Sequence, residues 1–282
     1  GSGKIIDSPG FNLIILCSLT SFGIWSLPQS IHKFYTIKDN SAIVKGTVIS
    51  TLFALIIGGS AYLNGGLSRL FFDASNAPVG DRVVPTMFEI VNMPSTLLGF
   101  IAVLMLSASM STLSSLSLSS ASTVSIDFYR GYIRKNASDA NVKVLLRVLC
   151  LVFILISALL AIAEVDAIVT LMSLSWGTIA GCFIGPYIYG LYFKKANKAG
   201  AYASITFSLL LTLTLVLVFG FTESPAGTEF GKVLKQGIGR APFIGVLAMA
   251  SSMIVTPVVS LLTQKFAPTS KTIELCFSSF KK

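Results

Sequence analysis

Charged residues are scarce in this chain. Only 12% of its 282 residues are Asp, Glu, Lys or Arg, whereas soluble domains contain roughly 25%. Hydrophobic residues make up 53% of the chain, and the mean hydropathy is +0.80. The low charge excludes an ordinary soluble fold, and the large apolar content excludes intrinsic disorder. We therefore expect an integral membrane protein.

Residues that build metal and catalytic sites are also scarce. His32 is the single histidine, and the four cysteines share no metal-ligand spacing, which argues against a disulfide or zinc framework. The catalytic patterns HExxH, GxSxG and GxxxxGK[ST] do not occur. The sequence therefore favours neither an enzyme nor an organic cofactor.

Long apolar runs are abundant. A membrane-spanning helix needs about 20 mainly apolar residues. The stretches that meet this condition are roughly 10–31, 46–66, 96–122, 147–164, 167–192, 201–221 and 242–264. The sequence thus predicts an all-α membrane protein with seven transmembrane helices.

Basic residues divide unevenly between the two sets of loops that alternate with these spans. Fifteen of the 21 Lys and Arg residues fall in one set and six in the other. Because cytoplasmic loops are enriched in Lys and Arg, we predict an external N-terminus and a cytoplasmic C-terminus in the plasma membrane. The net charge of +9 then reflects topology, and no nucleic-acid partner is expected.

The first predicted span contains helix-breaking residues. Gly23 relaxes the backbone, and Pro28 removes a hydrogen-bond donor and clashes with the preceding turn. Broken helices form substrate sites in secondary transporters. A simple proline kink is an equally good interpretation of this feature alone.

The third predicted span is rich in hydroxyl groups: ten of the fifteen residues from Ser111 to Ser125 are Ser or Thr. Hydrogen bonds to the preceding turn and close helix packing explain several of them. The span interiors contain no Asp, Glu, Lys or Arg, so a proton relay lacks its titratable group. A cation bound here would be held by neutral oxygen dipoles, which suits Na⁺.

The fifth predicted span carries Gly177, Gly181 and Gly185, followed by Pro186. Glycines four residues apart allow two helices to approach closely, and packing is the favoured interpretation. A role in lining a cavity stays open for neighbours such as Trp176.

Several sequence blocks resemble the sodium:solute symporter family, which includes sodium/proline, sodium/pantothenate and sodium/glucose transporters. The strongest block is ASMSTLS at 108–114, followed by Asp127 and Tyr129, which is similar to the family signature A-x-M-S-T-L-S…D-x-Y. The region from Gly23 to Phe34 resembles the family's broken helix. The region from Trp176 to Ala201 resembles a third block. The resemblance extends from about residue 11 to residue 266.

The resemblance implies a fold of two inverted repeats of five helices with flanking helices. Residues 10–192 would be the second repeat, core helices six to ten, with an external loop at 67–95. Residues 193–266 would form two trailing helices, 267–282 a basic cytoplasmic tail, and 1–9 an external tail or a cloning remnant. The chain would then be the C-terminal portion of a symporter without its first repeat.

The family's sites carry over in part. The resemblance implies a sodium half-site at Ala108, Ser111 and Thr112, and, as in some members, a second sodium near Ser114 and Ser115. The solute would lie against the first and fifth spans. The residues implied there are Gly23, Trp25, Pro28, Gln29 and Trp176, with Ile24 as the alternative to Trp25.

We therefore expect part of a sodium-coupled secondary transporter that works by alternating access. Na⁺ would be the coupling ion and the sole metal. The partners would be the lipid bilayer and a small organic solute, namely an amino acid, a pantothenate-like carboxylate or a sugar. The chain would be inactive without the missing first repeat. Two alternatives stay open: a solute-sensing module, and a split-gene half that pairs with a separate N-terminal half.

Overall fold

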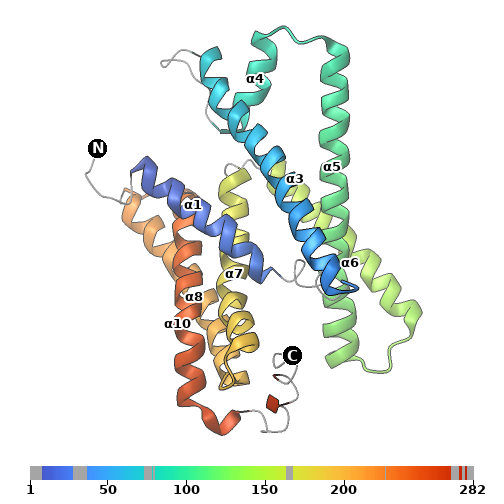
Figure 1. Ribbon diagram of the computed structural model, residues 1–282, viewed down its shortest axis with the longest axis vertical. Helices are drawn as coiled ribbons and strands as arrows, with labels where there is room; N and C mark the ends of the chain where they lie inside the picture. The colour runs from blue at the N-terminus through green and yellow to red at the C-terminus, as the bar shows by residue number, and fades with distance from the viewer. Residues whose placement is uncertain are drawn as a thin grey trace. The chain divides into compact units, whose positions relative to one another are not determined.

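The described part of the chain is built of helices. The computed structural model describes residues 8–27, 37–72, 78, 80–162, 168–225, 227–267, 273–274 and 277. Every regular element in these residues is a helix (Figure 1). The predicted all-α class is confirmed.

Six helices of the described residues are long and apolar enough to cross a membrane. They are α3 (Asn40–Leu67), α5 (Ser95–Ser122), α6 (Asp139–Ile162), α7 (Ile168–Tyr192), α8 (Lys198–Glu223) and α10 (Ala241–Leu262). Each coincides with one of the last six predicted spans. A helix closes its backbone hydrogen bonds within the segment, which makes it stable where no water is present.

The first predicted span is interrupted. α1 (Pro9–Gly23) is followed by one 3-10 turn, η2 (Ile24–Ser26), and the apolar helical segment Gly10–Ser26 is shorter than the six spans. Leu27 then adopts an extended backbone with φ −70° and ψ 124°, as expected for a residue that precedes proline. The helix prediction for 10–31 holds to Ser26, and residues 28–31 lie outside the described residues.

The chain divides into two compact units. One unit comprises residues 1–56 and 166–282, and the other comprises residues 57–165. In the first unit, α10 packs against α7 and α8, while α1 packs against α7 and α10 (Figure 1).

The second unit is built around α5. The helix continues as a π-helical segment, η5 (Thr123–Ile133), and both pack against α6. The short helix α4 (Val83–Ile90) packs against the 3-10 turns η3 (Ser68–Phe71) and η4 (Gly80–Arg82). α3, which is divided between the two units after residue 56, buries none of its residues, and α5 buries only Ser117 and Ala121. Wide apolar faces of both helices are thus left for lipid or for further protein.

The core of the first unit is a seam of small residues. A methyl group added at Gly177 would lie 2.5 Å from the Cα atom of Gly245 on α10, and one added at Gly181 would lie 2.6 Å from the Cβ atom of Ala248. The helix backbones are therefore in contact. The packing interpretation of the glycine motif is confirmed, because no side chain fits at these positions.

Hydroxyl groups connect the helices of this seam. Ser252 on α10 accepts a hydrogen bond from the Gly185 N–H at 3.0 Å, and its Oγ lies 2.7 Å from the Oγ of Ser204 on α8. Ser208 donates to the Gly181 carbonyl at 2.8 Å. Small residues and interhelical hydrogen bonds drive helix association where the hydrophobic effect between helices is absent.

A short amphipathic helix, α9 (Phe230–Gly239), covers one end of α8. Methyl groups added at Gly220 of α8 or Gly237 of α9 would collide with the backbone of Val233 and Val216, respectively. Arg240, which follows α9, pairs with Glu223 at the end of α8, with 2.8 Å between Nε and Oε1.

Candidate functional site

Several hydroxyl groups of α5 are bonded to the helix's own carbonyl groups. Thr112 Oγ1 donates to the Ala108 carbonyl at 3.2 Å, and Ser115 Oγ donates to the Thr112 carbonyl at 2.9 Å. Ser114 Oγ donates to the Met110 carbonyl at 2.6 Å. These bonds satisfy the hydroxyl protons inside an apolar environment.

These bonds leave lone pairs on the hydroxyl oxygen atoms. A hydroxyl group that donates its proton keeps its lone pairs, and a backbone carbonyl has two lone pairs. The Thr112 hydroxyl and the Ala108 carbonyl are therefore two adjacent neutral oxygen atoms 3.2 Å apart. The carbonyl already accepts the Thr112 N–H of the helix and the Thr112 hydroxyl, so a cation would take the place of the hydroxyl proton. The sequence of α5, Ser95–Ser122, has no acidic or basic residue. No charged side chain on the same helix therefore pairs with these oxygen atoms.

The five residues predicted to hold sodium are all exposed: Ala108, Ser111, Thr112, Ser114 and Ser115. The neighbouring helix α6 meets α5 elsewhere, with Cys150 Sγ 3.7 Å from the Ser117 carbonyl. An ion on this face of α5 would need further oxygen ligands from another helix.

Two of the residues predicted to contact solute, Gly23 and Trp25, lie at the break after α1. Ser26 is fully buried, and its Oγ donates to the Gly23 carbonyl at 2.9 Å. Trp25 is 57% exposed and meets Phe22 edge to face, with 5.8 Å between ring centroids. Pro28 and Gln29 lie outside the described residues.

The break lies against α7, which carries Trp176. Both α1 and η2 pack on α7, and a methyl group at Gly23 would lie 3.7 Å from the Cβ atom of Ala180, one turn beyond Trp176. Trp176 is half-buried. Gly23, Trp25 and Trp176 therefore belong to the same unit, whereas the predicted sodium residues on α5 belong to the unit of residues 57–165.

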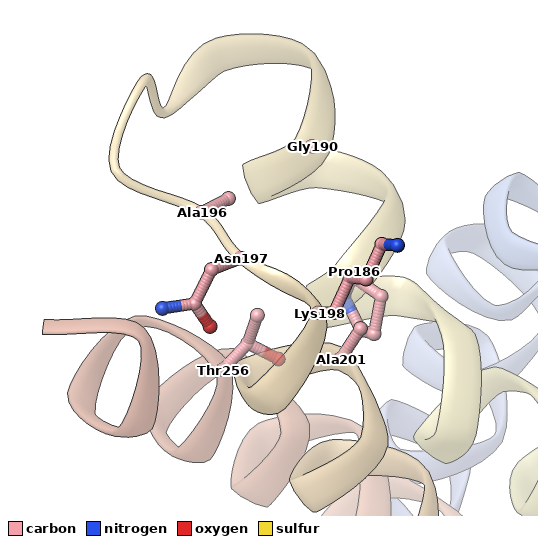
Figure 2. Close-up of a pocket in the computed structure, with 7 residues that line it drawn as sticks. All are labelled: Pro186, Gly190, Ala196, Asn197, Lys198, Ala201 and Thr256. Atoms are coloured by element: carbon pink, nitrogen blue, oxygen red, sulfur yellow. The ribbon is translucent and has the colours of Figure 1, made fainter. Parts of the chain in front are cut away.

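A pocket lies between the end of α7, the turn 193–197, and α8 and α10. Its volume is about 310 Å³, at the lower end of the roughly 300–1,000 Å³ of small-molecule sites. Figure 2 shows its lining residues, Pro186, Gly190, Ala196, Asn197, Lys198, Ala201 and Thr256. Sequence reasoning missed this pocket, because it depends on how three helices meet.

Asn197 fixes the turn that forms one wall of this pocket. Its Oδ1 caps α8 by accepting from the Gly200 N–H at 2.9 Å, and its Nδ2 donates to the carbonyl groups of Ser260 at 3.1 Å and Thr263 at 2.8 Å. One buried amide thus starts α8 and ties it to α10. The sequence carried a signal for this role, since Asn just before an apolar run is a preferred helix cap.

Six apolar helices of membrane length define an integral membrane protein with several spans. A family model described as the sodium:solute symporter family matches residues 2–207. The chain belongs to the sodium:solute symporter family, which is a family of membrane transporters and not of enzymes.

Curated relatives agree with this family. The chain is 28% identical to a sodium/pantothenate symporter of Haemophilus influenzae, with 76% of this chain and 45% of the relative aligned. It is 27% identical to a sodium/proline symporter of the same organism (89% and 48%) and 25% identical to an osmoregulated proline transporter of Bacillus subtilis (93% and 50%). The chain spans about half the length of these relatives. No solved structure matches it.

Proposed function

We propose that this chain forms one part of a sodium-coupled symporter that takes up a small organic solute by alternating access. The observation that carries the proposal is the pair of neutral oxygen acceptors on α5, the Thr112 hydroxyl and the Ala108 carbonyl, 3.2 Å apart. Their segment matches the family signature, and the family model covers it. The Ser111 hydroxyl, one position earlier on the exposed helix, would complete this side of the site.

Neutral oxygen ligands favour an alkali cation over a proton. A proton site needs a group that titrates, and such groups are rare within membranes unless they have this role. The sequence of α5 contains none. Na⁺ bound by dipoles would stabilise one conformation, and a solute that binds that conformation better would be coupled to it. A second ion near Ser114 and Ser115 is part of the proposal.

The proposed sodium ligands on α5 are exposed, which supports a sodium site that this chain forms only in part. A cation loses its hydration shell only where enough oxygen atoms replace it, and α5 offers them from one side. We infer that the remaining ligands come from a preceding repeat of the same or a separate polypeptide. The chain alone would then bind Na⁺ weakly and would not transport.

The proposed solute is a small molecule with a carboxylate group. Two of the relatives are named for proline and one for pantothenate, and both compounds carry one carboxylate. The broken segment after α1 supports a site at Gly23 and Trp25, because broken helices form the substrate sites of many secondary transporters. Trp176, Pro28 and Gln29 complete the proposed cavity. The proposed orientation has the N-terminus outside and the C-terminus in the cytoplasm.

Thermal stability in detergent tests the sodium site. We would compare NaCl with KCl at equal ionic strength, for this chain and for a longer polypeptide that also contains the preceding repeat. A ligand present at 100 times its Kd adds about 2.7 kcal/mol to the folded state. We expect a Na⁺-specific stabilisation of the longer polypeptide, lost in Thr112→Ala, and none of this chain alone.

Thr123→Ala is the matched control. Thr123 also donates to a carbonyl one turn back, that of Ser119 at 3.1 Å, so the substitution removes the same kind of bond outside the proposed site. The proposal fails if Thr112→Ala and Thr123→Ala respond alike to Na⁺. Accumulation of proline or pantothenate by this chain alone in liposomes, driven by a Na⁺ gradient, would contradict the half-site.

A further inference from the structure

The pocket between α7, α8 and α10 combines an apolar wall with one cation. Pro186, Gly190, Ala196 and Ala201 supply apolar surface, and Lys198 supplies the charge (Figure 2). The other polar groups of the lining are already bonded: Thr256 donates to the Ser252 carbonyl at 2.8 Å, and Asn197 bonds to α8 and α10. A ligand would therefore meet hydrocarbon-like walls and a single ammonium group.

Positive charge around the pocket is unopposed by nearby acids in the sequence. Lys194, Lys195 and Lys198 follow one another across the turn, and no Asp or Glu occurs between Asp166 and Glu223. α8 has no acidic residue in its first turn, so the positive end of its dipole adds to the same field. The charges on this segment favour an anionic ligand over a cationic one.

The position of the pocket indicates which class of anion it would bind. It lies where α7 ends and α8 begins, at the end of two membrane-length helices, and lysines at helix ends extend to the level of lipid headgroups. A soluble phosphate would gain nothing from the apolar walls. Basic pockets between transmembrane helices bind anionic lipid headgroups.

We propose that this pocket binds one anionic phospholipid, with an acyl chain against Pro186 and Ala201 and the headgroup phosphate on Lys198. The turn that forms the wall is held in place before binding. Asn197 joins it to Ser260 and Thr263, and Gln264 Nε2 donates to the Lys195 carbonyl at 3.2 Å. This binding goes beyond the proposed transport function and does not depend on it.

Photo-crosslinking of lipid tests the proposal. The 282-residue chain would be placed in nanodiscs with a small fraction of phosphatidylglycerol or phosphatidylcholine that carries a photoreactive group in the acyl chain. Labelled peptides would be mapped by mass spectrometry. We expect labelling of the segments around 186–201 and 256 by phosphatidylglycerol, exceeding that by phosphatidylcholine by about fivefold, the effect of one lysine near a membrane surface.

Three variants distinguish the contribution of the lipid headgroup to binding from that of the acyl chain. Lys198→Gln should reduce phosphatidylglycerol labelling to the phosphatidylcholine level, and Ala201→Leu, which fills the pocket, should reduce labelling by both lipids. Lys143→Gln removes an exposed lysine near the start of α6 and should change nothing. Far-UV circular dichroism and size-exclusion chromatography would verify that each variant is folded.

Several results would overturn the proposal. Equal labelling by the two lipids, or labelling of the Lys198→Gln variant equal to that of the unmodified chain, would exclude headgroup recognition. Absence of label in these segments would show that lipid does not occupy the pocket. Competition by inorganic phosphate would assign the site to a free anion. A failure of Na⁺ binding would leave these outcomes unchanged, so the two proposals can fail separately.

Discussion

Replacing Gly181 with alanine should push two helices apart. The added methyl group would lie 2.6 Å from the Cβ atom of Ala248 and 3.1 Å from its carbonyl carbon, whereas carbon atoms in optimal contact are about 3.5–4.0 Å apart. α7 and α10 would have to separate by about 1 Å, and a gap of this size forfeits a quarter to a half of the dispersion attraction at each contact. We expect the free energy of unfolding to fall by about 1–3 kcal/mol.

Gly190→Ala is the matched control on the same helix. A methyl group at Gly190 would have no atom within 4 Å, so only the helix propensity changes. Alanine is favoured over glycine within a helix by roughly 0.5–1 kcal/mol. The same chemical change on α7 should therefore destabilise the protein at position 181 and leave it unchanged or stabilise it at position 190.

A compensating substitution identifies the contact itself. Ala248→Gly removes the methyl group that the new side chain would strike first. In that background, Gly181→Ala should cost less, with a coupling energy of about 1 kcal/mol, within the range for residues in contact.

The assay is reversible unfolding in mixed micelles with an increasing mole fraction of sodium dodecyl sulfate, followed by far-UV circular dichroism. The reasoning is refuted if Gly181→Ala is as stable as Gly190→Ala. It is also refuted if Ala248→Gly leaves the cost of Gly181→Ala unchanged.

Two further predictions concern single residues that fasten neighbouring helices. Asn197→Ala removes the α8 cap and the two bonds to the carbonyl groups of Ser260 and Thr263. In the same assay the free energy of unfolding should fall by about 2 kcal/mol. A decrease below 0.5 kcal/mol, within the range of ordinary surface substitutions, would contradict the assigned role. Gly237→Ala places a methyl group against the Val216 carbonyl, so α9 should undock and its amide hydrogens should exchange about tenfold faster if docking weakens by 1.4 kcal/mol. Gly231→Ala, on the same helix with open space around it, is the control, and equal protection of α9 in both variants would show that this contact does not hold it.

The membrane class and most spans could be predicted because the bilayer constrains the sequence directly. A run such as Val148–Leu160 on α6 has only one stable structure in lipid, a helix with its backbone hydrogen bonds closed. The break at Gly23 was predicted for a similar local reason, since glycine and proline act on the backbone around them. The family resemblance named Ala108, Ser111 and Thr112 from the signature alone, and their role in binding sodium stays a prediction.

The first predicted span shows the limit of hydropathy. The run 10–31 is apolar enough for a span, yet the α-helix ends at Gly23. Hydropathy measures the cost of burying side chains in lipid and is insensitive to where backbone hydrogen bonds stop. The serine and threonine residues of α8 and α10 were likewise read only as parts of apolar spans, although their spacing of four residues already placed Ser204 and Ser208 on one face.

The class of protein, the approximate helices and the family could all be inferred without a structure, since each follows from local composition or from a contiguous motif. Tertiary structure alone decided which helices meet at Gly181 and Ala248, that Ser252 bonds to both Gly185 and Ser204, and that a pocket opens beside Lys198. These features join residues tens of positions apart. Their geometry depends on contacts at the ångström scale between helix surfaces, which no local property of the chain specifies.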